Sequence, residues 1–139
     1  MSRANRVQDQ ALLIVGLGLS GRSALRYLHD QGAKLTVTDS RPAPDDLQDL
    51  KTRFPDVDFR FDGFAAPAPL DQFAEAVVSP GVDLREPFVQ ALRASGLPLI
   101  GDIELFARAV GADTKVIGIT GTNGKSTVTT LVAEMARAA

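Results

Sequence analysis

Short continuous apolar runs alternate with amphipathic segments along most of the chain. Runs such as ALLIV and AVV, which contain no polar residue, are typical of parallel strands buried on both faces. The run VDFRF instead alternates Val57, Phe59 and Phe61 with polar residues, so this strand is predicted to have a wetter face and to lie near a sheet edge. The strands predicted in this way are residues 12–15, 35–39, 57–61, 76–79 and 97–101.

Amphipathic helices are predicted between these strands. The first has Gly21, Ala24, Leu25 and Leu28 at helical spacing, with Gly32 placed to end it. The other two are predicted from Leu47, Leu50 and Phe54 behind Pro44, and from Phe88, Ala91 and Leu92 behind Pro87. The repeated order of strand and helix predicts an α/β fold, with a Rossmann-like doubly wound parallel sheet over residues 10–101.

The pattern changes at residue 102. A helix is predicted from there to residue 110, followed by a polar break, a buried strand KVIGIT over 115–120, a glycine loop and a further helix. The predicted apolar faces of these two helices are Ile103, Phe106, Ala107 and Val110, and Val128, Leu131, Val132 and Met135. A lone strand, loop and helix cannot bury such a face. We therefore expect one domain over residues 1–101 and, over 102–139, the start of a second, truncated domain.

Composition narrows the classes of partner. The 139 residues are 45% hydrophobic and 23% charged, with a formal net charge of −2, and Lys and Arg are scattered singly. Without a basic stripe, no nucleic acid partner is expected. The absence of cysteine and the single histidine leave little for a metal site of thiolates or imidazoles.

No apolar run approaches the roughly 20 residues of a membrane span. We therefore expect no membrane partner and a cytoplasmic location, and we expect the protein to act as a monomer. The polar residues 1–8 are predicted to be disordered.

The motif GLGLSG joins the first strand to the first helix, where backbone N–H groups and a helix N-terminus attract a phosphate. Gly16, Gly18 and Gly21 match the G-x-G-x-x-G pattern, and Asp39 follows where a dinucleotide fold has its ribose-binding acid. Taken alone, this pattern indicates an NAD-binding site. Two alternatives stay open: the glycines serve only a tight turn and close packing, or the crevice holds another nucleotide diphosphate.

Polar residues follow two of the predicted strands. Asp39, Ser40 and Arg41 end the second strand, and Ser79 with Pro80 ends the fourth. Carboxyl ends of parallel strands open onto one crevice, so together these residues outline a polar pocket. Either group could be turn chemistry alone, and for Ser-Pro-Gly by itself that is the better interpretation.

The stretch GTNGKST departs from the usual nucleotide-binding loop, because Ile119 stands where that motif requires its first glycine. The loop still fits a triphosphate: its backbone N–H groups can surround phosphate oxygens, and Lys125 offers a positive charge. Ser126 offers an oxygen to Mg²⁺, and Thr127 can hydrogen-bond a phosphate. The alternative is a simple turn with Lys125 in solvent.

GTNGKST with TVTTL behind it resembles the short ATP loop of the Mur ligases and of the related folylpolyglutamate synthases, which lack the first glycine. GLGLSG, DSR, SPG and GDIELF, in this order and spacing, resemble the first domain of the Mur ligases that add D-glutamate. The resemblance covers nearly everything after residue 10. It implies that the crevice holds the uridine diphosphate of a substrate, and that the G-x-G-x-x-G pattern does not mark an NAD site here.

The resemblance also implies roles for individual residues. The expected UDP site consists of Gly18, Leu19, Ser20, Ser40, Arg41 and Ser79. The expected ATP site consists of Gly121, Thr122, Asn123, Gly124, Lys125, Ser126 and Thr127, with Lys125 catalytic and Ser126 a ligand of Mg²⁺.

By the same resemblance, the activity is an ATP-dependent ligation in peptidoglycan precursor synthesis, on which cell wall biogenesis, cell shape and cell division depend. ATP phosphorylates the carboxylate of UDP-N-acetylmuramoyl-L-alanine, and the amine of D-glutamate then displaces phosphate to form the amide. The family also needs a central-domain carboxylate, a carbamylated lysine and a third domain, none of which this chain contains. The chain alone is therefore expected to be inactive.

Two other classes of function stay open. A nicotinamide-dependent oxidoreductase domain explains GLGLSG and Asp39 but leaves GTNGKST unexplained. A catalytically silent nucleotide-binding module explains both motifs. Titration with NAD, a UDP-sugar and Mg-ATP separates the three classes.

Overall fold

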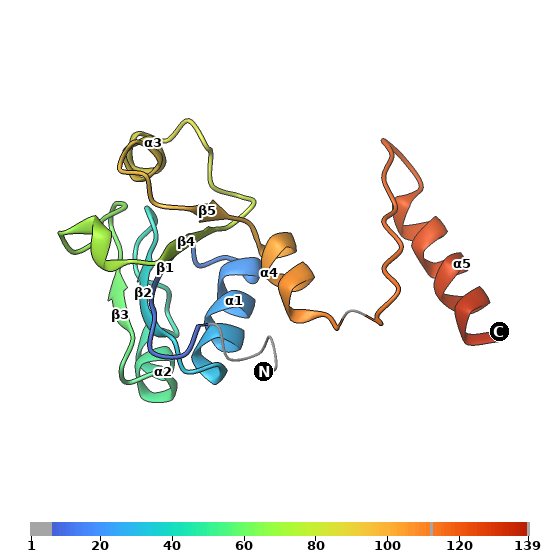
Figure 1. The fold of residues 1–139 in the computed structure, drawn as a ribbon, viewed down its shortest axis with the longest axis horizontal. Coiled ribbons are helices and arrows are strands. Elements are labelled where there is room, and N and C mark those ends of the chain that lie inside the picture. Colours follow the sequence, from blue (N-terminus) through green and yellow to red (C-terminus); the bar gives the residue numbers. More distant parts are fainter. Residues whose placement is uncertain (1–6, 112, 139) are drawn as a thin grey trace.

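A computed structural model describes residues 7–111 and 113–138. Its centre is a five-stranded parallel sheet in the order β3-β2-β1-β4-β5 (Figure 1). The strands are β1 (Ala11–Val15), β2 (Lys34–Thr38), β3 (Asp58–Arg60), β4 (Glu75–Val78) and β5 (Leu99–Ile100). The α/β class, the parallel sheet and the edge position of β3 are confirmed.

Helices cover both faces of this sheet. They are α1 (Leu19–Asp30), α2 (Leu47–Arg53), α3 (Pro87–Ala94) and α4 (Asp102–Ala109), with a 3₁₀ turn η2 (Leu70–Gln72) and, further along, α5 (Lys125–Ala138). Successive residues of β1 point to opposite faces: Leu12 and Ile14 pack with α1, α2 and α4, whereas Leu13 and Val15 pack with α3. The sheet is therefore doubly wound, as predicted.

The first strand and helix form as their sequence predicts. Leu12 to Val15 are fully buried in β1, which has a neighbouring strand on each side. The buried residues of α1 are Gly21, Ala24, Leu25 and Leu28, the predicted apolar face. Gly32 follows the helix with φ +79°, a backbone conformation that glycine adopts without strain, and its N–H donates to the carbonyl of His29. This unit positions the GLGLSG loop at the carboxyl end of β1.

The predicted apolar face is partly wrong for α3 and wrong for α4. In α3, Leu92 is buried and Phe88 packs against the core as predicted, but Ala91 is exposed and Val89 is buried. In α4 the buried residue is Leu105, whereas Ile103 and Phe106 are exposed. Helical spacing fits more than one stripe on so short a helix, and the stripe that meets the sheet is the one that is buried.

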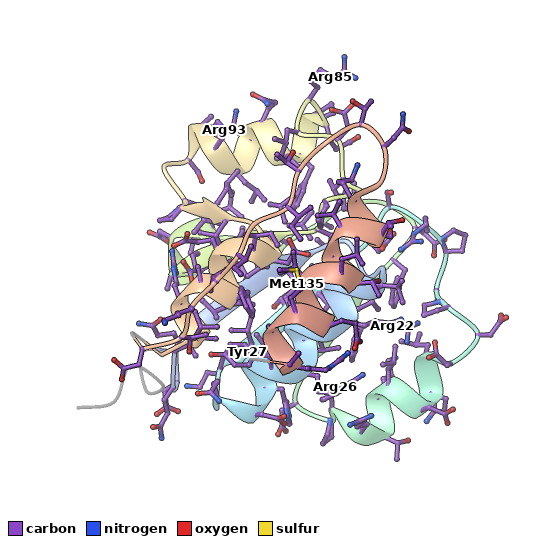
Figure 2. The ribbon with its side chains drawn as sticks, turned by 90° about the vertical axis from the view of Figure 1, so that its right-hand side faces the viewer. Arg22, Arg26, Tyr27, Arg85, Arg93 and Met135 are labelled. Carbon is purple, nitrogen blue, oxygen red and sulfur yellow. The ribbon has the colours of Figure 1, made fainter. Side chains whose placement is uncertain are left out.

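The strand predicted over 115–120 is also not formed: in the described residues this stretch is extended but has no strand partner. Strand structure needs a neighbour to accept its hydrogen bonds, and no other strand lies beside this stretch. The helix behind it, α5, does form, but none of its described residues is buried. Of its predicted apolar face, Val128, Leu131 and Met135 are exposed, and Val132 is partly exposed; Met135 is labelled in Figure 2.

Helix α4 packs on the sheet domain. Leu105 joins the core beside α1, and Arg108 on the same helix bonds the Glu75 carboxylate of β4 at 2.8 Å and Glu104 at 2.8 Å. The division into domains at residue 101 stays a prediction. So does the disorder of residues 1–8, of which residues 1–6 lie outside the described part, while Val7 packs against the core. None of the described helices is long and apolar enough to cross a membrane.

Candidate functional site

The GLGLSG loop leaves β1 in a sharp turn that two of its glycines make possible. Gly16 has φ +90°. A Cβ atom on Gly21 would lie 1.9 Å from the carbonyl oxygen of Gly16, so no side chain fits where α1 crosses the loop. Gly16 and Gly21 are therefore required by the turn and by close packing, whatever the loop binds.

Gly18 is not required by packing. A Cβ atom there would have no neighbour within 4 Å, and the residue is the N-cap of α1. No side chain caps this end of the helix, and its first turn holds no acidic residue. The first helical hydrogen bond in this turn is donated by Arg22 to Gly18, so the preceding N–H groups have no acceptor within the helix. Such an end is suited to an anion, and Gly18 leaves space for one to approach.

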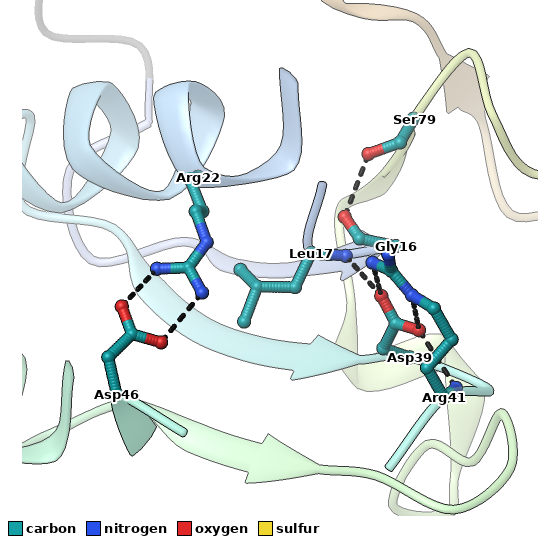
Figure 3. Close-up of polar contacts among 7 residues, drawn as sticks. All are labelled: Gly16, Leu17, Arg22, Asp39, Arg41, Asp46 and Ser79. Atoms are coloured by element: carbon teal, nitrogen blue, oxygen red, sulfur yellow. Dashed lines mark hydrogen bonds and ion pairs between the residues drawn. The ribbon is translucent and has the colours of Figure 1, made fainter. Parts of the chain in front are cut away.

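Asp39, at the carboxyl end of β2, has a side chain whose hydrogen bonds are all internal. Its Oδ2 accepts from the backbone N–H of Leu17 at 2.6 Å and from Arg41 Nη2 at 2.7 Å, and its Oδ1 accepts from the N–H and Nε of Arg41, both at 2.9 Å (Figure 3). A carboxylate offers about four acceptor positions, and here all are used. Asp39 therefore has no free acceptor for a ribose diol, which removes the group on which the NAD interpretation depends.

Burial by itself would raise the pKa of Asp39. The hydrogen bonds from the Arg41 guanidinium and from the backbone N–H groups of Leu17 and Arg41 outweigh burial and lower that pKa to about 2. Asp39 is thus a carboxylate at any physiological pH. Its negative charge fixes the guanidinium of Arg41, whose side chain remains 65% exposed.

Ser79 joins the ends of the neighbouring strands β1 and β4. Its hydroxyl donates to the carbonyl of Gly16 at 2.7 Å, and its N–H donates to the carbonyl of Val15 at 2.9 Å (Figure 3). The residue is 8% exposed. The hydroxyl oxygen keeps lone pairs for a further donor.

A cavity of about 450 Å³ opens at this end of the sheet, above β1, β2 and β4. It brings together every residue that the sequence predicts for the UDP site: Gly18, Leu19, Ser20, Ser40, Arg41 and Ser79. This is the crevice at which open parallel sheets bind nucleotides, because the crossovers diverge on either side of β1 and β4.

Comparison with known proteins identifies the family. Residues 10–101 match the family described as "Mur ligase MurD-like, N-terminal domain". The chain belongs to this family. The matched range contains the cavity and every predicted UDP residue, and it ends before α4.

Individual relatives agree with the family. The chain is 50% identical over 137 residues to a UDP-N-acetylmuramoylalanine--D-glutamate ligase of Methylobacillus flagellatus, and 50% identical over 133 residues to one of Marinobacter nauticus. Each alignment covers 96% of this chain and 29% of the relative. The chain thus spans less than a third of the length of these Mur ligases.

A solved structure shares the fold. The structure of a pseudomurein peptide ligase type C from Methanothermus fervidus superposes with a TM-score of 0.59 at 22% sequence identity. The superposition covers 86% of this chain and 24% of that chain. At this identity the likeness concerns the fold alone.

The second predicted site, GTNGKST, lies on the segment that Figure 1 shows standing apart from the sheet. Gly121 and Gly124 have φ values of +148° and +76° and form a turn that leads into α5. Lys125 is the first residue of this helix, and its ammonium donates to the carbonyl of Gly121 across the loop. Thr122, Asn123, Ser126 and Thr127 are exposed. The loop and helix form, but the strand expected before them does not, and the roles of these residues stay predictions.

The described residues contain no group of three His, Cys, Asp or Glu side chains that could hold a metal ion. Ser126 can offer one hydroxyl oxygen. Mg²⁺ usually keeps several waters and takes only one or two protein ligands beside substrate phosphates, so a single hydroxyl is compatible with it.

Sequence reasoning missed four residues of the cavity wall: Phe64, Val82, Asp83 and Glu86. Phe64 follows β3 and stacks on Phe88 of α3, with ring centroids 5.8 Å apart. An aromatic residue just after a strand end could have indicated it. The other three precede α3 in a turn that carries no sequence signal for a ligand.

Proposed function

We propose that this chain forms the substrate-nucleotide domain of a UDP-N-acetylmuramoyl-L-alanine:D-glutamate ligase. The proposed reaction is ATP-dependent formation of an amide bond in peptidoglycan precursor synthesis, in the cytoplasm. It consumes ATP, D-glutamate and UDP-N-acetylmuramoyl-L-alanine. Family membership and the names of relatives that are 50% identical support this reaction.

The observation that carries the proposal is the single cavity that contains all six predicted UDP residues. At its floor, the unpaired N–H groups of α1 suit a diphosphate, and Gly18 leaves the space for it. At its side, Arg41 adds a fixed positive charge, held by Asp39. A guanidinium in a fixed orientation recognises phosphate oxygens or a planar base better than a mobile one does.

In this proposal, the domain acts by positioning. The nucleotide is a handle distant from the reacting carboxylate, and binding it fixes the orientation of the rest of the substrate. Orientation of this kind lowers the entropic part of the barrier without any chemistry at the nucleotide itself. Ser20, Ser40 and Ser79 would supply hydrogen bonds that select the uridine diphosphate.

We propose further that GTNGKST is the ATP loop. Its backbone N–H groups and the Lys125 ammonium would neutralise charge on the phosphates during transfer, with Lys125 exchanging the Gly121 carbonyl for a phosphate oxygen. Ser126 would hold Mg²⁺ together with nucleotide oxygens and water, and the metal would supply charge neutralisation when bound. Residues 102–139 are proposed to begin the domain that contains this loop.

Calorimetric titration of the 139-residue chain tests the nucleotide assignment. UDP and UDP-N-acetylmuramoyl-L-alanine are expected to bind more tightly than NAD. Arg41→Ala is expected to weaken UDP binding about tenfold or more, since a charge-assisted contact is removed. Arg93→Ala is the control, because Arg93 is an exposed arginine of α3 that does not line the cavity and pairs with no carboxylate among the described residues. Tighter binding of NAD than of UDP would exclude this function.

A further inference from the structure

A second depression, also of about 450 Å³, adjoins the nucleotide cavity on the α2 side of the GLGLSG loop. The two share Gly18, Leu19, Asp39 and Arg41. Its outer wall is the segment that connects β2 to α2, which includes Pro42 and Pro44. We name residues 40–46 the strap. Because Arg41 belongs to the strap and lines both depressions, the position of the strap sets the position of Arg41.

The strap is anchored at its first end by backbone and side chain together. Arg41 donates three hydrogen bonds to Asp39, and its carbonyl accepts from the N–H of Asp62 at 3.0 Å. From there Pro42 and Pro44 limit the backbone angles of the strap. The two prolines therefore reduce the number of conformations that the strap can adopt.

The far end continues into α2, whose Leu50 is buried in the core and donates its N–H to the carbonyl of Asp46 at 3.0 Å. One side-chain pair joins this end to α1. Arg22, in the first turn of α1, donates from both terminal nitrogens to the two carboxylate oxygens of Asp46, at 2.7 and 2.8 Å (Figure 3). We name this pair the clasp. It joins residues 24 positions apart, and the side chain of Leu17 lies between the clasp and the Asp39–Arg41 pair (Figure 3). The geometry is bidentate, the arrangement in which arginine and carboxylate fix one another's orientation.

We propose that Arg22 and Asp46 are positioning residues for nucleotide binding: the clasp holds the strap against the first turn of α1 and so keeps Arg41 at the rim of the cavity. This inference rests on the proposed UDP function for its ligand. Neither residue lines the nucleotide cavity itself, so they act through the strap and not by touching the nucleotide.

The expected effect is modest. The side chains of Arg22 and Asp46 are 31% and 47% exposed, and a partly exposed ion pair is screened by water. Loss of the clasp is expected to weaken UDP binding roughly two- to fivefold, the range that such pairs contribute. A larger loss is not expected, because Asp39 continues to hold the guanidinium of Arg41.

Charge reversal separates the clasp from a general effect of charge. Arg22→Asp and Asp46→Arg are each expected to weaken UDP binding, and the double variant Arg22→Asp/Asp46→Arg is expected to restore it to within about twofold. The control is Arg26→Asp, one turn further along α1 (Figure 2), which makes the same change of net charge at an exposed arginine that pairs with no carboxylate among the described residues. It is expected to leave UDP binding unchanged.

A second measurement needs no ligand. Amide hydrogen exchange at Arg41 and Leu47 reports on the strap, since these N–H groups donate to Asp39 Oδ1 and to the carbonyl of Pro44. Asp46→Asn is expected to speed exchange at both sites severalfold while exchange in β1 stays the same. Unchanged exchange in Asp46→Asn, or single reversals that the double variant does not rescue, would overturn the clasp. If the unaltered chain bound no UDP, the proposed function would fail, while the exchange experiment would still decide whether the clasp holds the strap.

Discussion

At the scale of single residues, the three glycines of GLGLSG illustrate how one motif can combine two demands. Gly21 faces the carbonyl of Gly16, where an added Cβ would stand 1.9 Å from oxygen. Gly18 faces open space, with φ −78°, a backbone angle that any residue adopts. Gly16 and Gly21 are thus required by the fold, whereas Gly18 leaves space for a ligand.

These two environments predict opposite phenotypes for the same substitution. Gly21→Ala is expected to destabilise the protein by about 3 kcal/mol, a Tm lower by roughly 10 °C, because backbone atoms must move apart. Gly18→Ala is expected to leave Tm within about 2 °C and to weaken UDP binding roughly tenfold, since its methyl group occupies the approach of the diphosphate. Thermal unfolding and calorimetry measure the two effects. A Gly18→Ala variant that unfolds early but binds normally would contradict this assignment.

At the scale of elements, α4 shows how a short helix selects its buried face. Leu105 is 7% exposed and belongs to the core beside α1, whereas Ile103 on the opposite side is 74% exposed. Arg108 helps to fix the rotation of α4 about its own axis, because it pairs with Glu75 of β4 and with Glu104 on the same helix. Hydrophobicity alone does not distinguish the two faces.

Leu105→Ala and Ile103→Ala form a matched pair on this helix. The first is expected to lower the free energy of unfolding by about 2 kcal/mol, through lost burial and the cavity left behind. The second is expected to change it by less than about 0.5 kcal/mol, because an exposed side chain loses little on truncation. Chemical denaturation followed by circular dichroism measures both. Equal effects would mean that the buried face is not the one described.

The environment of each helix and strand explains which of them could be predicted from the sequence. The strands and helices between residues 11 and 100 follow from apolar runs, from the alternation in VDFRF, from helical spacing and from stop signals such as Gly32. Each of these elements has its packing partners within the chain. The strand predicted over 115–120 has no such neighbour, and periodicity cannot supply one. At the site, GLGLSG and the strand ends predicted the position of the cavity. The hydrogen bonds of Asp39 to Leu17 and Arg41, and the position of Phe64 in the cavity wall, depend on tertiary contacts that residue spacing does not predict.

At the scale of the whole molecule, the chain divides into a well-packed part and an exposed part. The sheet and its helices contain both buried clusters, while residues 113–138 contain no buried residue. Val128, Leu131 and Met135 remain 45% to 71% exposed on α5. The free energy that holds this helix therefore comes from its own hydrogen bonds and not from packing.

Hydrogen exchange is expected to reveal this division in the 139-residue chain. Amides of α5 are expected to exchange close to the rate of an unstructured peptide, because a 14-residue helix without packing opens readily. Amides of β1 and β4 are expected to be protected by several orders of magnitude. Mass spectrometry of peptic fragments measures both. Comparable protection of α5 and β1 would show that the helix is packed in solution.

The order of the strands also bears on how the protein behaves at high concentration. The two outer strands are the shortest of the sheet, with three residues in β3 and two in β5, and the longer strands all lie between them. An outer strand is where one sheet can extend into another and begin an aggregate, and its capacity to do so grows with the length of its unpaired backbone. A sheet that confines its unpaired backbone to such short strands is protected against this route to aggregation by its topology, and the charged side chains of Asp58 and Arg60 add to that protection at β3.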